Sequence, residues 1–520
     1  MKPRSRKNRI LALALAAALA TTLLSGCGSS GQTSQSDASG SGSTGSVKDE
    51  VVVVLKAEPS NIDPHGNTEL VAMTTQVQIF ETLVTKDEEG NIVPCLAESW
   101  EQIDDHTVRF TLRDDVYFHN GEKLTAEDVV FSIQRAVEKP SSAAIFAAFD
   151  PENTKVVSEL VVDVATKNPY AAIFNYLAST RGEIVSKKAV EEMGDDQFGR
   201  SPVGTGPFMF DSWTTGTSIT LKRNENYWGE KPAYSTLTLK FITETANRAL
   251  EIEAGNADIV LDPDTADLDR LAALDGLEVV SGDSYGMSYI AFTMDDEVLS
   301  DVRVRQALSM ALDLDSLVTS VYGSYATVAE SVMPNTVFAY ESQGGHVYDV
   351  EQAKQLLADA GYADGLTLTL NLPNSSEQQN IGVIAQNMWR EIGVTAEIAT
   401  ASTSEVIAAG RRGDNQIVVM AATYSTGDPG HALADFDTRS DGFLRPNDTH
   451  IDELLDQGSA TYDETERAAV YAELQEYIYG QYYMIPVANK TVNYVITDQV
   501  ENFYCDPGNI PSFAGVVVYE

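Results

Sequence analysis

A cluster of polar residues with possible binding chemistry follows the apolar run QIVVMAA. It reads TYSTGDPGH, residues 423–431, and combines hydroxyl groups with a phenol, a carboxylate and an imidazole. A carboxylate can bind an ammonium group or a metal ion, and an imidazole can bind a metal. Asp and Gly are also the residues that end a strand in a turn. A ligand site, a metal site and a plain turn are therefore all compatible with this pattern.

The motifs of common enzymes and cofactor sites are absent. The sequence has no GxSxG, no HExxH, no GxxxxGK[ST], and no GxGxxG between a strand and a helix. The Gly-rich VGTGPF, residues 203–208, is interpreted as a turn into a strand. No two histidines stand four residues apart, which argues against zinc-type ligation. We therefore expect no enzyme activity, no cofactor and no metal site; the histidines are His65, His106, His119, His346, His431 and His450.

The first residues predict export. Five cations precede the apolar run ILALALAAALATTLL, which is short for a membrane span of about 20 residues and typical of a signal peptide. The peptide, residues 1–27, ends in LSGC. These four residues resemble the lipobox of bacterial lipoproteins, which implies acylation of Cys27. The Gly/Ser tract that follows, residues 28–47, is predicted to be a flexible tether. We expect a folded part that starts near Val47, lipid-anchored outside the cell membrane or in a periplasm.

The chain is strongly acidic, with 35 Lys and Arg against 77 Asp and Glu and a net charge of −42. Such a surface argues against nucleic acid as a partner. Beyond Cys27 only Cys95 and Cys505 occur. Without a disulfide framework we expect two separate buried thiols rather than a bridge.

Strand and helix patterns alternate along the chain, which predicts an α/β fold. One unit runs DVEQAKQLLADAGY, LTLTLNL, QQNIGVIAQNMWREIG, VTAEIAT, SEVIAAGRRG and QIVVMAAT as helix, strand, helix, strand, helix and strand. Its first helix has Asp349 as N-cap and Gly361 just past its end. A second unit, strand, helix and strand, covers residues 237–261. Thr125 and Asp463 are further predicted N-caps.

Six stretches resemble, in order, the solute-binding proteins of family 5, the receptors of peptide and nickel ABC importers. They are PSNIDPHGN, CLAESWEQIDDHTVRFTLRDDVYFHNGEKLTAEDVVFSIQRA, PVGTGPFMFDSW, LKRNENYWGEKP, DVRVRQALSMALD and AKQLLADAGYADG. The resemblance extends from about Val51 to the C-terminus. It implies an α/β, bilobed, periplasmic-binding-protein-like fold of type II, whose lobes close over a ligand at the hinge.

The resemblance also implies three domains, one of them inserted. Domain I would comprise residues 48–69, 201–284 and 491–520; domain II, residues 70–200; and domain III, residues 285–490. We expect four motif aromatics to be core rather than ligand contacts because they stand among apolar neighbours: Trp100, Phe110, Trp228 and Trp389.

The binding residues are expected on irregular segments that end strands, because ligand groups in α/β sheets gather at the carboxyl ends of strands. Two segments qualify, HGNTEL after the first strand and TYSTGDP after QIVVMAA. The candidate ligand contacts are Asn67, Thr68, Glu69, Tyr424, Ser425, Thr426, Asp428 and His431.

The second segment departs from the pattern of peptide-binding members. These hold the peptide ammonium with an Asp three residues before the acidic member of an Asp/Glu-Pro pair, usually with a Trp upstream. Here Asp428-Pro429 matches the pair, but Ser425 occupies the ammonium position, and alanines replace the Trp. A serine cannot offset an ammonium charge, and charge-assisted bonds are roughly twice as strong as neutral ones. Asp428 either takes over this role or only stabilises the turn.

A histidine close after the same proline is a feature of the nickel-binding branch, and His431 stands near that position. An exposed turn histidine is the favoured interpretation, since one imidazole is a thin ligand set for a metal.

The resemblance implies a lipid-anchored, monomeric receptor that delivers small peptides to the permease subunits of an ABC importer. The alternative is the same receptor for another solute, a metal chelate such as a nickel complex or a small polar organic molecule. A secreted hydrolase is a third interpretation, against which the missing motifs argue.

Overall fold

A computed structural model describes residues 45–520 except residues 89, 441, 443 and 445. All the structure discussed below belongs to one compact unit, Gly45–Glu520. The predicted signal peptide, Cys27 and most of the tether lie outside the described residues. Val47 already pairs with Tyr519. Within the described part of the chain, no helix has both the length and the apolar character needed to cross a membrane.

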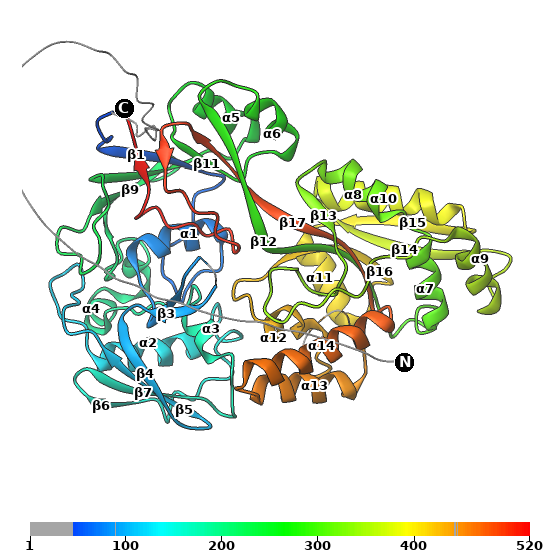
Figure 1. The fold of residues 1–520 in the computed structure, drawn as a ribbon, viewed down its shortest axis with the longest axis horizontal. Coiled ribbons are helices and arrows are strands. Elements are labelled where there is room, and N and C mark those ends of the chain that lie inside the picture. The colour runs from blue at the N-terminus through cyan, green and yellow to red at the C-terminus, as the bar shows by residue number, and fades with distance from the viewer. Residues whose placement is uncertain (1–44, 89, 441, 443, 445) are drawn as a thin grey trace, which may run out of the picture. The chain divides into compact units, whose positions relative to one another are not determined.

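A sheet of eleven strands forms the framework (Figure 1). Its order is β15-β14-β16-β12-β17-β11-β1-β10-β9-β8, and β13 pairs with β17. The strands are β1 (Glu50–Leu55), β8 (Phe208–Thr214), β9 (Ser218–Arg223), β10 (Thr236–Phe241), β11 (Ile259–Leu261), β12 (Leu277–Phe292), β13 (Ala326–Val328), β14 (Leu366–Pro373), β15 (Val394–Ala401), β16 (Ile417–Thr423) and β17 (Met484–Thr497).

Two long antiparallel strands, β12 and β17, join the two halves of this sheet. At one end β17 pairs with β11, and at the other end β12 pairs with β16. We call the part built on β1 and β8–β11 the first lobe and the part built on β13–β16 the second lobe. The register between β12 and β17 shifts between Asp283 and Met287. This register shift lies where the chain passes from one lobe to the other.

The first lobe buries both faces of its parallel strands. In the run EVVVVL of β1, Val51 and Val53 pack into one core cluster, while Val54 packs into another on the opposite face. Alternate side chains of a strand point to opposite faces, so a run of valines predicts burial on both. The other elements that pack with the strands of this lobe are α1 (Leu70–Ile79), α4 (Lys187–Phe198), α5 (Thr245–Glu253), α6 (Thr265–Ala272), β18 (Val500–Glu501) and β19 (Val517–Val518).

A smaller four-stranded antiparallel sheet of order β4-β5-β7-β6 belongs to the inserted part. Helix α2 packs on this sheet, and Phe110 of β5 is fully buried in the core that they share. Thr125 caps α2 in a capping box with Asp128, which confirms the predicted N-cap. The elements are β2 (Val84–Lys86), β3 (Ile92–Pro94), β4 (Ala97–Asp104), β5 (Thr107–Leu112), α2 (Ala126–Glu138), β6 (Lys155–Ser158), β7 (Val161–Ala165) and α3 (Ile173–Leu177).

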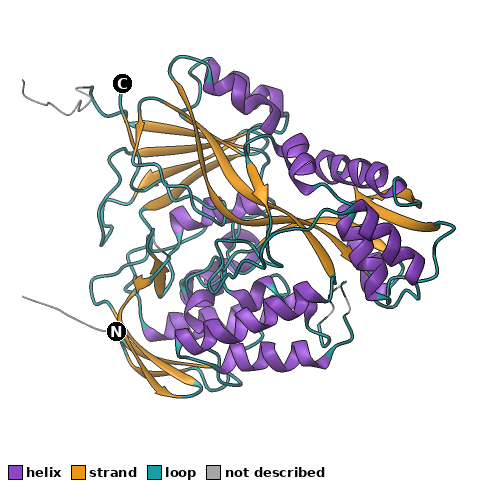
Figure 2. Cartoon of the chain, turned by 45° about the vertical axis from the view of Figure 1, so that its right-hand side comes forward, coloured by secondary structure: helices purple, strands orange, loops and turns teal. Residues whose placement is uncertain are grey.

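The second lobe has helices packed against both faces of its strands; Figure 2 shows helices in purple and strands in orange. In β16, Ile417 and Val419 join one core cluster, and Val418 and Met420 join another. The helices are α7 (Val302–Met310), α8 (Leu314–Tyr322), α9 (Val350–Asp359), α10 (Ser376–Arg390), α11 (Thr403–Arg412), α12 (Pro429–Ala432), α13 (Thr449–Ala460) and α14 (Glu464–Gly480), with a 3₁₀ turn at Ala434–Phe436.

The predicted N-caps of the second lobe are confirmed. Asp349 accepts a hydrogen bond from the Gln352 backbone N–H, and Asp463 accepts from those of Thr465 and Glu466. Among the four aromatics expected in the core, Phe110 and Trp389 are fully buried, and Trp100 and Trp228 are partly buried against it. Cys95 and Cys505 are both free, as expected, but half-buried rather than buried.

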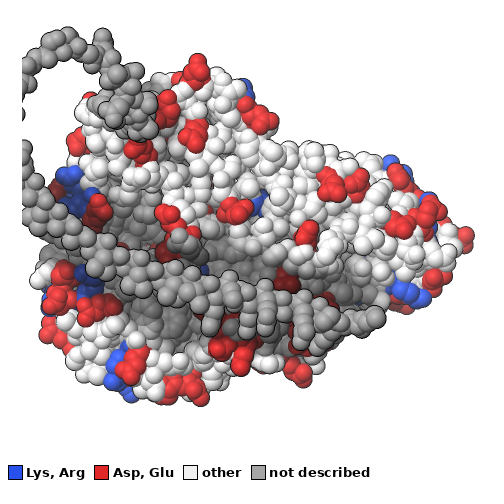
Figure 3. All heavy atoms as spheres, viewed as in Figure 1, with Lys and Arg blue, Asp and Glu red and all other residues white. Residues whose placement is uncertain are grey.

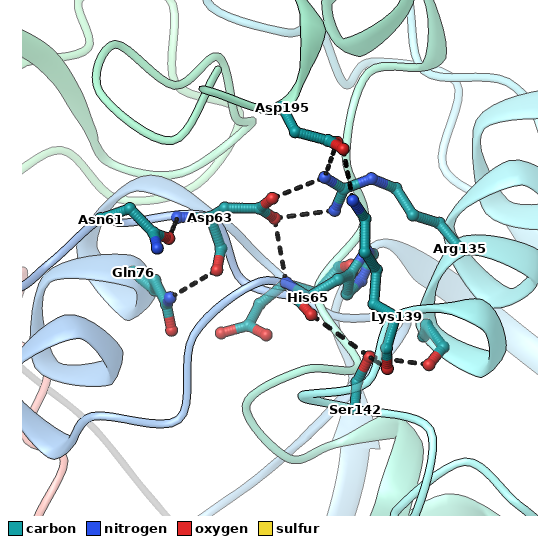
Figure 4. Close-up of polar contacts among 10 residues, drawn as sticks. Asn61, Asp63, His65, Gln76, Arg135, Lys139, Ser142 and Asp195 are labelled. Carbon is teal, nitrogen blue, oxygen red and sulfur yellow. Dashed lines mark hydrogen bonds and ion pairs between the residues drawn. The ribbon is translucent and has the colours of Figure 1, made fainter. Parts of the chain in front are cut away.

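Two of the sequence stretches that carried the family resemblance meet around Arg135 (Figure 4). Asp63, from PSNIDPHGN, accepts two hydrogen bonds of 2.7 and 2.5 Å from the Arg135 guanidinium of α2, and both side chains are about 5% exposed. Asp195 accepts a further bond of 2.6 Å from the same group. A buried charge pair is stable only when its geometry satisfies both partners, as it does here. The contact fixes the segment that precedes α1.

The predicted domain boundaries stay a proposal. Two of the predicted boundaries, at residues 284/285 and 490/491, fall inside β12 and β17, next to the register shift. Carboxylates spread over the visible face of both lobes (Figure 3), in keeping with the acidic composition.

Candidate functional site

Two cavities lie where the lobes meet. The first, of about 390 Å³, is lined among others by Glu81, Lys86 and Tyr285. The second, of about 410 Å³, is lined among others by Thr68 and Tyr424. Both are lined by Ser425, Gly508 and Ile510, so they adjoin along a common wall. Volumes of this size suit small ligands.

The segment after β16 forms part of this common wall. The Tyr424 backbone N–H donates to the Tyr285 carbonyl at 3.1 Å. Gly427 has a φ of +64°, and a Cβ on it would lie 2.7 Å from the Tyr285 ring. A left-handed conformation in such close contact requires glycine. The segment is thereby held against β12, with Ser425 facing both cavities.

Asp428 lies behind this wall and lines neither cavity. Its carboxylate accepts bonds of 3.0 and 2.8 Å from the Arg467 guanidinium and one of 3.0 Å from Asn175 Nδ2. It also accepts from the Gly430 backbone N–H at 2.9 Å as the N-cap of α12. Asp428 is fully buried, and its charge is compensated inside the protein. The structure thus assigns it supporting contacts.

Thr426 is also buried behind the wall. Its hydroxyl lies 3.1 Å from His431 Nδ1 and accepts from the Asp428 backbone N–H at 3.2 Å. Its carbonyl accepts a hydrogen bond from Lys86 Nζ of the first lobe. Thr426 therefore positions His431 and links the lobes.

The predicted HGNTEL segment meets the second cavity through Thr68 and Leu70. Asn67 is buried and donates to Ser60 Oγ at 3.0 Å and to the Asn61 carbonyl at 2.8 Å. The Glu69 carboxylate accepts from the Ser60 backbone N–H at 2.8 Å. Asn67 and Glu69 thus shape the loop that presents Thr68, and neither lines a cavity.

His431 lies on α12 and lines the second cavity, rather than standing in an exposed turn. Its ring packs edge to face against the Tyr424 ring, with 5.6 Å between the ring centroids. Burial lowers the pKa of His431 to about 4, so the imidazole is neutral near pH 7. Among the described residues, no three His, Cys, Asp or Glu side chains gather closely enough to hold a metal ion.

Several cavity residues were not predicted from the sequence. Lys86 and Arg181 come from the inserted part, and no local pattern distinguishes them from surface cations. Asp506 and Gly508 belong to the run DPGN near the C-terminus. That run contains the same turn residues as TYSTGDP, so the reasoning applied to the latter would have found it.

Glu81 is one of two glutamates of the first cavity whose pKa is strongly raised; the other is Glu183. The Glu81 carboxyl accepts hydrogen bonds from the Tyr227 hydroxyl at 2.8 Å and from Trp228 Nε1 at 3.0 Å. Burial raises the pKa of Glu81 from 4.5 to about 7, against the lowering effect of these hydrogen bonds. The native protein therefore holds a proton at Glu81 that the unfolded chain releases between pH 4.5 and 7.

Replacing Glu81 by Gln should raise stability at alkaline pH. A raised pKa adds stability that is complete below pH 4.5 and is lost as pH rises through 7. The neutral amide escapes this loss, so the variant should exceed the wild type by on the order of 2 kcal/mol at pH 8 and by little at pH 4. Urea unfolding at both pH values measures this. A difference that is equal at the two pH values contradicts the prediction.

The lobes touch each other beside the cavities. Besides the Lys86 and Asn175 contacts, the Ala171 backbone N–H of the first lobe donates to the Ser459 carbonyl of the second at 2.7 Å. Two lobes joined by two strands, with cavities of mixed apolar and polar lining between them, define a two-lobed binding protein.

The family follows from the sequence match. The model described as bacterial extracellular solute-binding proteins, family 5 Middle, matches residues 91–443. The chain therefore belongs to family 5 of the bacterial extracellular solute-binding proteins. The resemblance and the predicted fold class are confirmed. The family comprises solute-binding proteins rather than enzymes.

Individual relatives cover nearly the whole chain. It is 27% identical to heme-binding protein A of Haemophilus influenzae, over 97% of this chain and 98% of that protein. It is also 27% identical to di/tripeptide-binding protein 1 of Pseudomonas aeruginosa, over 90% and 94%. The solved structure of HbpA2 from Haemophilus parasuis has the same fold, with a TM-score of 0.82 and 24% identity over 91% of this chain and 100% of that chain.

Proposed function

We propose that this protein is the lipid-anchored receptor of an ABC importer and captures small peptides between its lobes. The observation that carries the proposal is the pair of adjoining cavities at the lobe interface, each of several hundred Å³. The di/tripeptide-binding relative supports the peptide as solute. The signal peptide and Cys27 support anchoring at the outer face of the cell membrane, or in the periplasm where an outer membrane exists.

Among the candidate contacts, we propose that Thr68, Tyr424, Ser425 and His431 touch the solute, while Asn67, Glu69, Thr426 and Asp428 hold these residues in place. Four of the eight residues line the second cavity. The other four form hydrogen bonds with neighbouring groups of the protein. Ser425 and the engaged Asp428 argue against an ammonium held in the way usual for peptide-binding members. Backbone hydrogen bonds to a solute would then matter more than a charged anchor.

A second candidate is the same receptor for a metal chelate or another small polar molecule. The observation that favours it is His431, a neutral imidazole beside Tyr424 on the second cavity. The heme-binding relative adds support. A chelate arrives with most of its ligands, so one imidazole can complete its coordination.

Native mass spectrometry of gently purified protein tests the proposal, because such a receptor is expected to retain its solute. The expected result is a set of bound masses that match di- and tripeptides. Calorimetry with a mixed di- and tripeptide pool should show binding by the emptied protein. Absence of heat with this pool, together with a retained metal chelate lost in His431→Ala, would favour the second candidate.

The solute stabilises a closed arrangement of the lobes only through its higher affinity for that arrangement. We expect small-angle scattering to show a smaller radius of gyration with saturating solute. An unchanged radius contradicts lobe closure.

A further inference from the structure

The inserted part of the first lobe touches the second lobe at a rim outside the two cavities. Just before α3, the Ala171 N–H donates to the Ser459 carbonyl of α13 at 2.7 Å. The neighbouring Tyr170 N–H donates to the Tyr462 hydroxyl at 3.1 Å. That hydroxyl donates in turn to the Asp105 carbonyl, in the turn between β4 and β5, at 3.0 Å. We call these five residues the rim latch.

The rim latch forms because its backbone groups lack partners within their own lobes. Ser459 is the last residue but one of α13, and the last four carbonyls of an α-helix have no donor within the helix. Tyr462 directly precedes Asp463, the N-cap of α14, so its backbone is held between two helix ends. Among the described residues, the N–H groups of Tyr170 and Ala171 have no acceptor other than the one across the rim.

Two other polar contacts between the lobes reach a cavity. Lys86 donates to the Thr426 carbonyl, and Asn175 donates to Asp428 at 3.0 Å. Both donors line the first cavity, so a solute there can compete for them. No residue of the rim latch lines either cavity. The rim latch therefore stabilises the closed arrangement of the lobes independently of the solute.

We propose that the rim latch sets the fraction of solute-free protein that is closed, and with it the affinity for every solute. The N–H groups of Tyr170 and Ala171 bond to water once the lobes separate, so the rim latch exists only in the closed arrangement. An interaction present in one arrangement only shifts the population toward that arrangement. Tyr462 forms two of the three hydrogen bonds, as the acceptor of one and the donor of the other.

The inference rests on the proposed closure of the lobes and goes beyond it, because it assigns part of the affinity to residues that a solute does not touch. With the open arrangement predominant in the absence of solute, the apparent affinity is proportional to the closed fraction. Loss of the two Tyr462 hydrogen bonds, at a partly exposed site, should lower that fraction roughly 3- to 10-fold.

Single-molecule energy transfer between the lobes measures the closed fraction without any solute. The dyes are attached to azide-bearing residues that replace exposed Glu101 of β4 and exposed Glu473 of α14. The wild type should show a minor closed population, and Tyr462→Phe should lower the ratio of closed to open molecules roughly 3- to 10-fold. An unchanged ratio, or a wild type that never closes, overturns the inference.

Tyr479→Phe is the matched control. Tyr479 is partly buried like Tyr462, but its hydroxyl donates to the Gly345 carbonyl at 3.3 Å within the second lobe. Its loss should leave the ratio of closed to open molecules unchanged. An equal fall of this ratio in both variants would mean that a tyrosine hydroxyl acts through the stability of the second lobe, which overturns the rim latch.

Calorimetry with the dipeptides Ala-Leu and Ala-Glu separates the rim latch from the solute site. Tyr462→Phe should weaken the binding of both dipeptides by the same factor, because no contact with the solute changes. Unequal factors would show that Tyr462 acts on the solute itself and would overturn the rim latch. If neither dipeptide binds the wild type, the peptide function fails, and the energy-transfer result still decides on the rim latch.

Discussion

Replacing Arg467 by Ala should destabilise the protein by about 3–5 kcal/mol. The substitution leaves the Asp428 carboxylate without the guanidinium that donates to both of its oxygens. The side chains of the pair are 6% and 1% exposed, so water cannot replace the lost partner. Asn175 and the Gly430 backbone N–H still donate to Asp428, but neither carries a positive charge.

Urea unfolding at pH 7 measures this effect, and two variants control it. Arg412→Ala breaks an exposed pair with Asp414, whose side chains are 61% and 58% exposed, and should cost well below 1 kcal/mol. Adding Asp428→Asn to Arg467→Ala removes the uncompensated charge and should restore part of the loss. If Arg467→Ala alone lowers the free energy of unfolding by less than about 1 kcal/mol, the Asp428 charge is stabilised in another way.

Gly204→Ala should destabilise the protein by about 3 kcal/mol or more. A Cβ at this position would lie 2.0 Å from the Ile79 carbonyl oxygen at the end of α1. That oxygen belongs to backbone and also accepts from the Gly206 N–H at 2.8 Å, so it cannot move aside without breaking a bond. The methyl group must displace the VGTGPF turn from α1, next to Phe80 and Pro207 of the first cavity.

Gly480→Ala is the matched control for this substitution. Gly480 is the last residue of α14, and nothing would lie within 4 Å of its added Cβ. Alanine is the better helix former, so this variant should be unchanged or up to about 1 kcal/mol more stable. Chemical unfolding of both variants compares them directly. Equal stabilities of Gly204→Ala and Gly480→Ala would contradict the close approach of the two backbones.

Local features of the fold could be predicted from the sequence because their causes are local. Asp349 caps α9 by accepting a hydrogen bond from a backbone N–H three residues away. The consecutive valines of β1 predict burial on both faces of the strand, whatever its position in the sheet. The pairing of β12 with β17 joins residues about two hundred positions apart, and the hydrophobic pattern of a strand does not predict which distant strand it pairs with. The family resemblance, rather than residue patterns, supplied the two lobes.

The same distinction applies to the site. TYSTGDP could be recognised because turn residues follow an apolar strand. The engagement of Asp428 depends on Arg467 and Asn175, which are distant in sequence and reach it only in the folded chain. Arg181 has no sequence signal, since only the folded chain distinguishes this buried arginine of the second cavity from a surface cation.

The register shift between β12 and β17 has a geometric consequence for any rotation of the lobes. Tyr285 lies at this shift, where its N–H donates to the Pro507 carbonyl of the first lobe at 2.9 Å and its carbonyl accepts from Tyr424 of the second. Displacement in a rotation grows with distance from the axis. An axis here would let the cavity walls beside Tyr285 move little while the outer contact between Ala171 and Ser459 separates more. A small solute at the axis would thus control a larger movement at the rim, where a partner could detect it.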